Sequence, residues 1–373
     1  MKMKARIIAF YLPQFHAIPE NNEWWGQGFT EWTSVKNGQP LFKGHVQPKI
    51  PGELGYYNLL DPIVREKQAK LAQYAGIEGF CYWHYWFGNG RRLLEKPFNE
   101  VLSSGKPEFP FCLGWANHSW SRKTWTKYKS GASQMLMEQL YPGDEDIINH
   151  FNTVLPAFKD KRYITVDGKP LFLIWAALDL PNPRHFFDVW NKLALKNGLK
   201  GIHFVGLKGG PLSEHKKPLE IGYDAVCWEN FYSAELKTSW LKTYLFPKIH
   251  RFHSSKLFLK KYKYKDIIKN FFTDIDKNEN IYPTIVANYD RSPRGGEKAV
   301  IFYGSTPELF CEHVSEALHL IRNKQDEHKI LFLRSWNEWG EGNYMEPDLK
   351  YGRGYLEALR DCVKQQMVRE TNL

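Results

Sequence analysis

The sequence predicts an α/β fold, a (β/α)8 TIM barrel with a helical insertion before the seventh strand. Two observations lead to this prediction. Short apolar runs bounded by turn signals recur along all 373 residues, and helical patterns lie between several of them. The runs are apolar on both faces, which is typical of parallel strands covered by helices, and eight such units are the number that closes a barrel.

The predicted strands are short apolar runs bounded by turn signals. In chain order they cover residues 6–12, 78–86, 109–117, 170–177, 202–209, 223–231, 281–290 and 329–336. Helical patterns beginning near Pro, Asp or Ser cover residues 62–74, 146–158, 183–196 and 307–322.

Two departures from a regular barrel are expected. Asp167-Gly168, between two β-like runs, predicts a hairpin that leads into the fourth strand. Residues 230–280 form a long insertion before the seventh strand. No internal repeat, low-complexity tract or convincing linker divides the chain, so we expect a single domain over residues 1–373.

The composition is that of a globular protein with an excess of aromatic residues. Hydrophobic residues make up 43% and charged residues 25%, which argues against disorder, collagen and coiled coils. Aromatic residues reach 16%, with 14 Trp. Tryptophan stacks on the apolar faces of sugars and also anchors ordinary cores, so the excess is compatible with a carbohydrate site and with a large core.

The net charge of +10 is unevenly distributed. Residues Lys248 to Lys269, KIHRFHSSKLFLKKYKYKDIIK, interleave lysines with apolar residues. Such a segment could lie on an anionic membrane as an amphipathic helix, or it could be a solvated helix with its apolar face inward. No nucleic-acid partner is expected because no reader motif is present, and the oligomeric state cannot be read from the sequence.

The cysteines and the N-terminus suggest a cellular location. Three of the five cysteines, Cys81, Cys112 and Cys227, lie in apolar strand runs, and the sequence has no CxxC pair, which points to a reducing compartment. The N-terminal apolar run is too short for a signal peptide, and no stretch approaches the ~20 apolar residues of a membrane span. We expect a cytoplasmic protein, soluble or peripheral to a membrane.

A doubly wound nucleotide-sugar fold is the main competitor. No GxGxxG follows a strand, which argues against it. Two D-x-D matches, at 144–146 and 274–276, could hold a metal, but so short a pattern arises by chance and the first is also typical of a helix N-terminus. No zinc motif is present. We therefore expect neither a metal nor another cofactor.

Polar and aromatic residues gather where the predicted strands end, which in a barrel is the face that holds the active site. Each one alone is typical of an ordinary loop residue, whereas together they favour a binding site. The candidates for substrate binding are Tyr11, His16, Trp83, His84, Trp115, Asn117, Glu229, Asn230 and Asn337; Gln14, Trp86, His118, Tyr232, Asn288 and Asp290 stand at the same rim.

The candidate catalytic residues are Glu338 and Glu341 in SWNEWGEGNYMEP, residues 335–347. Glycosidic cleavage needs a proton donor and a base or nucleophile, usually two carboxyl groups. Residues three apart on a turn can bring their side chains together, and Gly340 and Gly342 permit such a turn. A salt-bridge or helix-cap pair is the plainer alternative, since E-x-x-E is common.

Five segments resemble the WbsX-type proteins, and the resemblance covers essentially the whole chain. They are FYLPQFHAIPENNEWWGQGFTEWTSV (10–35), FKGHVQPKIPGELGYYNLLDP (42–62), GIEGFCYWHYWF (76–87), PFCLGWANHSW (110–120) and SWNEWGEGNYMEPD (335–348). That family is found in bacterial O-antigen and capsule loci, is often labelled glycosyltransferase, and is related to glycoside hydrolase family 99.

The resemblance implies a mechanism and roles for the two glutamates. Family 99 enzymes are metal-independent (β/α)8 barrels that cleave α-mannosides with retention, and their Glu-Trp-His-Glu stretch is similar to residues 338–341. By resemblance, Glu338 removes the sugar 2-hydroxyl proton to form a 1,2-anhydro sugar, and Glu341 protonates the departing oxygen. Gly340 stands where the family has histidine, which puts mannose specificity in doubt.

Three functions follow as hypotheses. The first is a retaining α-glycoside hydrolase or transglycosylase acting on a bacterial surface polysaccharide or its lipid-linked precursor. The second is a glycosyltransferase of lipopolysaccharide or capsule synthesis, in which residues 291–298, RSPRGGEK, could bind a donor diphosphate or form a solvated loop. The third is a glycan-binding protein without catalysis. For the first two, a cytoplasmic location is expected, either free in the cytoplasm or peripheral to the inner membrane.

Overall fold

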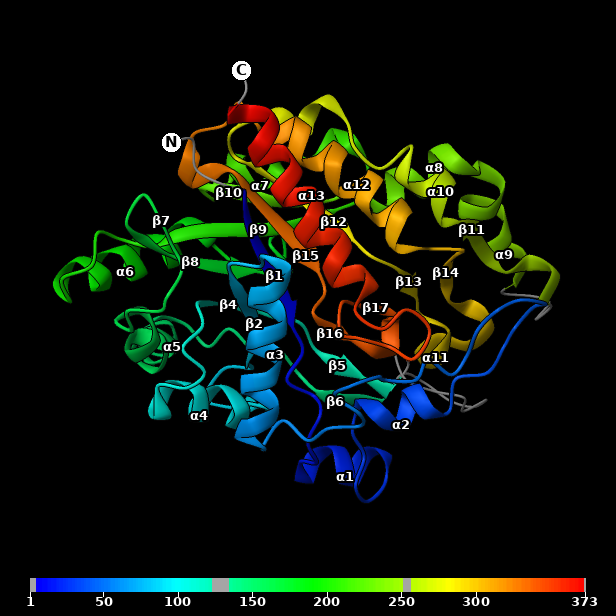
Figure 1. The fold of residues 1–373 in the computed structure, drawn as a ribbon. Coiled ribbons are helices and arrows are strands. Elements are labelled where there is room, and N and C mark those ends of the chain that lie inside the picture. The colour runs from blue at the N-terminus through cyan, green and yellow to red at the C-terminus, as the bar shows by residue number, and fades with distance from the viewer. Residues whose placement is uncertain (1–4, 123–133, 251–255, 372–373) are drawn as a thin grey trace.

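The computed structural model describes residues 5–122, 134–250 and 256–371. Eight strands form a closed parallel barrel, as the sequence predicts, with β1 hydrogen-bonded to both β2 and β15 (Figure 1). The strands, in chain order, are β1 (Arg6–Tyr11), β2 (Gly79–Trp86), β4 (Phe111–Trp115), β8 (Lys169–Ile174), β9 (His203–Gly209), β10 (Ala225–Glu229), β12 (Ile281–Val286) and β15 (Ile330–Arg334).

The four predicted helices are present as α3 (Pro62–Ala75), α5 (Asp144–Phe158), α6 (Pro183–Lys196) and α12 (Pro307–Ile321). The side chains of Asp61 and Thr306 cap the first turns of α3 and α12, which explains why these helices begin there. Further helices on the barrel are α4 (Lys96–Ser104), α7 (Lys217–Glu220) and α13 (Gly354–Thr371), the last packed against α3 and α12 (Figure 1).

The hairpin before the fourth strand is also confirmed. Strand β7 (Thr165–Val166) pairs antiparallel with β8. Between them Asp167 and Gly168 have φ values of 52° and 71°. Two consecutive residues with positive φ are what a two-residue type I′ turn requires, which is why Asp-Gly occurs there.

The insertion after β10 is mostly helical, as expected, but it also contributes a strand. Its elements are α8 (Phe231–Thr238), η3 (Leu241–Leu245), α9 (Phe246–His250), η4 (Lys256–Phe258), β11 (Lys260–Lys263), α10 (Tyr264–Ile268) and η5 (Asp274–Lys277). Strand β11 pairs with β14 (Val300–Tyr303), and β14 pairs with β13 (Tyr289–Asp290), which makes a small second sheet.

The expectation that residues 248–269 form one amphipathic helix is therefore wrong, because residues 260–263 are a strand; residues 251–255 lie outside the described part of the chain. The alternation of Lys261, Tyr262 and Lys263 has the period of a strand, and Tyr262 is buried while Lys263 is exposed. The apolar residues Ile267 and Ile268 of α10 are buried as well, so they cannot contribute to an exposed stripe.

The cysteines agree with the sequence-based expectation only in part. Cys81, Cys112 and Cys227 are buried free thiols in barrel strands. Cys311 on α12 and Cys362 on α13 form a disulfide with their Cα atoms 6.0 Å apart, which the sequence did not indicate and which disagrees with the expected reducing compartment. No helix among the described residues is long and apolar enough to span a bilayer.

Candidate active site

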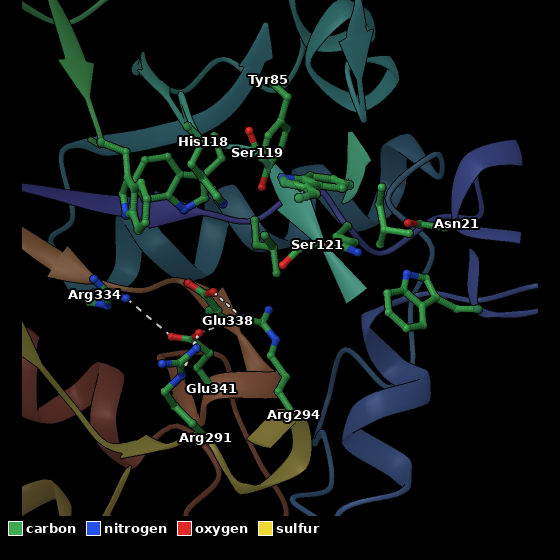
Figure 2. A pocket seen from close by; sticks show the side chains of 18 residues that line it. Asn21, Tyr85, His118, Ser119, Ser121, Arg291, Arg294, Arg334, Glu338 and Glu341 are labelled. Carbon is green, nitrogen blue, oxygen red and sulfur yellow. Dashed lines mark hydrogen bonds and ion pairs between the residues drawn. The ribbon is translucent and has the colours of Figure 1, made fainter. Parts of the chain in front are cut away.

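A cavity of about 240 Å³ opens at the C-terminal ends of the barrel strands (Figure 2). It combines charged, aromatic and neutral polar side chains, the mixture expected of a carbohydrate site. The charged groups are Arg291, Arg294, Arg334, Glu338 and Glu341; the aromatic groups are Trp25, Trp83, Tyr85, Trp120 and Trp175; the neutral polar groups include Gln14, Asn21, His118, Ser119 and Ser121.

A small hairpin after the eighth strand presents Glu338 and Glu341 to this cavity. Strand β16 (Asn337–Glu338) pairs with β17 (Asn343–Tyr344), and the short helix η8 (Trp339–Glu341) connects them. Gly342 ends that turn with φ +62°, and a Cβ there would lie 2.8 Å from the Cβ of Asp290, so only glycine fits.

Arg294 joins the two carboxyl groups. Its Nη1 donates to Glu338 Oε1 at 3.0 Å and to Glu341 Oε1 at 2.9 Å. Because both oxygens contact the same nitrogen, they can be no more than about 5.9 Å apart. The turn that the sequence suggested therefore does bring the two side chains together.

Glu341 lies among three guanidinium groups (Figure 2). Besides Arg294, its carboxylate contacts Arg291 Nε at 3.1 Å and Arg334 Nη2 at 3.5 Å. Burial by itself would raise the pKa of Glu341, but Arg291, Arg294 and Arg334 outweigh burial and lower the pKa to about 2. Glu341 is consequently ionised throughout the neutral range.

Glu338 has a different environment. It contacts one guanidinium group, that of Arg294, and accepts a hydrogen bond from Ser335 Oγ at 3.3 Å. Burial raises the pKa of Glu338, and the adjacent Glu341 carboxylate raises it further, while Arg294 and Arg334 oppose the shift. Two neighbouring carboxyl groups are thus driven apart in pKa, and Glu338 is the one that retains a proton more readily.

A third carboxyl group, Glu31, completes the cluster and was missed by the sequence reasoning. It is the first residue of α2 (Glu31–Lys36), is fully buried, and its Oε1 accepts from Arg294 Nε at 2.9 Å. Burial, with Glu338 and Glu341 nearby, raises the pKa of Glu31 to about 7 although Arg294 opposes the shift. A Cβ at Gly340 would lie 1.6 Å from Glu31 Oε1, so Glu31 occupies the space that a side chain at 340 would need.

Of the predicted substrate-binding residues, Trp83 lines the cavity and Glu229 lies behind it. Glu229 forms an ion pair with Arg334, which in turn contacts Glu341. Asn337 is buried beneath the two glutamates, where its Oδ1 accepts from the backbone N–H of Leu12 at 2.7 Å. It holds the hairpin to the first strand and does not reach the cavity.

Three other candidates do not line the cavity because side chains alternate across a strand. Phe10 and Trp83 stack on each other inside the barrel at 4.8 Å between ring centroids, so the adjacent Tyr11 and His84 point outward to the helices. Tyr11 donates to Gln68 Oε1 on α3, and His84 Nε2 contacts His150 Nε2 on α5 at 2.9 Å. Trp115 also turns outward, where it packs against Phe186 on α6.

The remaining three candidates are buried in loop contacts outside the cavity. His16 Nδ1 contacts the carbonyl of Pro13 at 3.0 Å. Asn117 Oδ1 accepts from the backbone N–H of Ala176 at 2.8 Å, and Asn230 Oδ1 accepts from Trp228 Nε1 at 2.5 Å. These side chains support the loops around the rim. The protein satisfies the Oδ1 atoms of Asn117 and Asn230, whereas His16 Nε2 is buried without a hydrogen-bond partner among the described residues.

Asn21 is a cavity residue that the sequence analysis did not single out. It lies on α1 (Pro19–Trp25), its side chain is fully buried, and neither Oδ1 nor Nδ2 has a hydrogen-bond partner within the described residues. Buried amides are nearly always paired, so an unpaired one that lines a cavity is a candidate ligand contact. It lies within the segment resembling the WbsX-type proteins, but no local pattern distinguishes it from Asn22.

The three carboxyl groups of the cavity cluster, Glu31, Glu338 and Glu341, each contact the Arg294 guanidinium. No group of three or more His, Cys, Asp or Glu residues in the described part of the chain is placed to hold a metal ion. Of the two D-x-D matches, Asp144 contacts His185 in the first turn of α5, and Asp276 accepts from the Thr273 backbone in a capping box.

The fold is that of glycoside-hydrolase-like barrels. A solved glycoside hydrolase-like protein matches with a TM-score of 0.60 and 16% identity over 97% of this chain and 94% of its own. The GH99 endo-α-mannosidase of Bacteroides thetaiotaomicron, in complex with bis-tris-propane, matches with a TM-score of 0.60 and 14% identity over 99% of both chains.

The chain belongs to the WbsX glycosyltransferase family, whose model matches residues 7–359. A relative in Xanthomonas campestris pv. campestris strain B100, the protein WxcX, is 32% identical over 364 residues, which are 97% of this chain and 50% of WxcX. The chain thus spans about half the length of this curated relative.

Proposed function

We propose that this protein is a carbohydrate-active enzyme that cleaves or transfers an α-linked glycosyl group with retention, using Glu338 and Glu341. The observation that carries the proposal is the shared contact with Arg294 Nη1, which limits the separation of the two Oε1 atoms to about 5.9 Å. Retaining enzymes hold their two carboxyl groups about 5–5.5 Å apart and inverting ones about 6.5–9.5 Å apart. The resemblance to proteins of O-antigen and capsule loci favours a bacterial surface polysaccharide or its precursor as substrate.

The contacts favour roles opposite to those that the resemblance implies. Glu338 protonates the departing glycosidic oxygen as the bond from the anomeric carbon to that oxygen breaks. Glu341, ionised among three arginines, takes the proton of the sugar 2-hydroxyl, whose oxygen then closes on the anomeric carbon to form the 1,2-anhydro sugar. In the second step Glu338 takes a proton from the incoming water or sugar hydroxyl as its oxygen bonds to the anomeric carbon. The bond from the anomeric carbon to the 2-oxygen breaks, and Glu341 returns its proton to the 2-oxygen.

The test is mass spectrometry of products from surface-glycan fragments incubated with wild type, Glu338→Gln and Glu341→Gln, with and without sugar nucleotides. Shortening or rearrangement without nucleotide that both variants lose supports the proposal. Unchanged activity in both variants contradicts it. Binding of the fragments without any turnover in wild type would instead indicate a non-catalytic glycan-binding protein.

Transfer from an activated donor is the second candidate, and the arginines favour it. Arg291 and Arg294 follow the seventh barrel strand and Arg334 ends the eighth, the region where barrels often bind phosphate. The side chain of Arg291 lines the cavity and is 43% exposed. Isothermal titration with sugar nucleotides would detect donor binding; affinity lost in Arg291→Ala, with product extension only in the presence of nucleotide, would replace the hydrolase proposal.

A further inference from the structure

Almost the whole net charge of the chain comes from one part of the insertion. Residues 236–269 contain ten Lys and Arg residues against one acidic residue, Asp266, and so supply +9 of the net +10. The rest of the chain is close to neutral. Because long-range attraction depends on such clustering, this segment dominates the interaction of the molecule with any anionic surface.

Large apolar side chains are exposed on the same elements. Trp240, Leu241 and Tyr244, at the start of η3 and within it, are 57%, 47% and 48% exposed, and Leu257 on η4 is 82% exposed. Helix η3 packs on α8 and α9, and α9 packs on η4, so these side chains belong to one group of elements. The Trp240 and Tyr244 rings stack, and Lys248 Nζ lies 3.9 Å from the centre of the Tyr244 ring.

This combination differs from an ordinary exposed surface. On α6, for comparison, Leu195 is the one large hydrophobic side chain of the helix that is exposed. Exposed Trp and Tyr next to Leu and Lys are the residue types that sit at a lipid–water boundary, where the rings enter the headgroup region and the lysines reach the phosphates. Charge alone would suit any polyanion, but the aliphatic and indole groups favour a surface with an apolar layer beneath its charge.

The position of these elements relates them to the cavity. They form the outer edge of the molecule on the side opposite α6 (Figure 1). Strand β11 of the insertion pairs with β14, and β14 pairs with β13, whose last residue Asp290 precedes Arg291 at the cavity. A surface bound at this edge is therefore connected to the site through one small sheet.

We propose that Trp240, Leu241, Tyr244, Lys248 and Leu257 form a docking surface that binds a bilayer containing anionic phospholipid. The surface holds the enzyme at a membrane, where a lipid-linked glycan would be concentrated. The docking proposal does not depend on the proposed function, because binding can be measured in the absence of any glycan.

The experiment is co-sedimentation of the whole protein with vesicles of phosphatidylcholine alone or of equimolar phosphatidylcholine and phosphatidylglycerol. Wild type is expected to bind the anionic vesicles at least about tenfold more tightly than the neutral ones, and to lose most of that binding in high salt. The triple variant Trp240→Ser/Leu241→Ser/Tyr244→Ser should lose at least about tenfold in vesicle affinity. The charge variant Lys237→Glu/Lys248→Glu, which keeps the apolar residues, should show a comparable loss of vesicle affinity.

A matched control carries Leu195→Ser, Lys192→Glu and Lys196→Glu on α6, which are all exposed. It should bind vesicles as wild type does, and glycan turnover in detergent-free buffer should be unchanged in all three variants. Equal vesicle affinity in the control and in both surface variants, or no binding to anionic vesicles, would overturn the proposal. Concentration-dependent dimerisation that Trp240→Ser abolishes would mean that a second copy of the chain covers this face, and would also overturn it.

Discussion

At the scale of single residues, the two candidate catalytic glutamates differ in the number of cations around them. Among the described residues, Glu341 contacts the guanidinium groups of Arg291, Arg294 and Arg334, whereas Glu338 contacts only that of Arg294. Their order in the chain says nothing about this difference, and the family resemblance implies the opposite roles. Which glutamate acts as the acid and which as the base is therefore a question for kinetics.

Glu338→Gln and Glu341→Gln should respond differently to the leaving group. We expect both variants to lose about 10²–10⁴-fold in turnover of natural glycans, because each removes a proton-transfer group. On a glycosyl fluoride, which needs little protonation, Glu338→Gln should recover most of the rate and Glu341→Gln should not. Steady-state kinetics on both substrates checks this; recovery in Glu341→Gln instead would restore the roles implied by the resemblance.

The unpaired amide of Asn21 leads to a prediction about binding. Asn21→Ala should raise KM several-fold with little change in kcat, because it removes a ligand contact remote from the reacting bond. Its free energy of unfolding should stay the same or rise slightly, since the substitution removes a buried polar group that has no protein partner among the described residues. Kinetics and urea titration measure the two effects.

Asn149→Ala on the exposed face of α5 is the matched control and should change neither KM nor stability. A large loss of stability in Asn21→Ala, with KM unchanged, would mean that the amide has a structural role and does not contact ligand.

At the scale of elements, helix α2 and the hairpin of β16 and β17 meet at Gly340. Gly340→Ala should lower the free energy of unfolding by about 1–3 kcal/mol, because its Cβ would overlap Glu31 Oε1 at 1.6 Å. Turnover should fall as well, since Glu31 contacts the Arg294 guanidinium that joins the two candidate catalytic glutamates. Denaturant titration and turnover of natural glycans measure the two effects.

The double variant Glu31→Ala/Gly340→Ala should be less destabilised than the sum of the two single variants, because removing the Glu31 carboxyl makes room for the methyl group. Strict additivity in this double-mutant cycle would show that the two positions do not compete for space.

At the scale of the whole molecule, buried carboxyl groups make stability depend on pH. Glu346 is fully buried and accepts from Tyr57, Gln68 and Trp339, and burial raises its pKa to about 7 despite these donors. A raised folded-state pKa stabilises the protein below the unfolded value of 4.5, and that contribution is lost as pH rises toward 7. The lowered pKa of Glu341 acts in the opposite direction, and its contribution is lost as pH falls from 4.5 toward 2.

We therefore expect the free energy of unfolding to fall as pH rises from 4.5 to about 7, by about 1–3 kcal/mol for Glu346. In Glu346→Gln this dependence should flatten, even if the variant is less stable overall, because the amide does not titrate. Urea titrations at several pH values measure it, and Glu66→Gln, on the exposed side of α3, should keep the wild-type slope. An unchanged slope in Glu346→Gln would assign the dependence to another group.

Most of the fold could be predicted because its signals are local. The eight strands and four main helices follow from runs and periodicities of neighbouring residues, and the hairpin at Asp167-Gly168 follows from two residues that tolerate positive φ. The proximity of Glu338 and Glu341 could be predicted for the same reason. They are three residues apart in the chain, and Gly340 and Gly342 permit a turn there. The prediction of one helix over residues 248–269 was wrong, because the alternating Lys and Tyr residues of β11 form a strand.

The sequence by itself therefore determined the barrel, the family and the position of the two glutamates along the chain. Only the tertiary structure decided which side chains surround them. Tyr11 points outward and Trp83 points into the barrel, and both orientations depend on how the strands are aligned. A shift of one residue would turn each side chain to the other face of its strand. The contact between Glu31 and Arg294 joins residues 263 positions apart, and no local pattern encodes it; it exists because closing the barrel brings the loops after its first and seventh strands together.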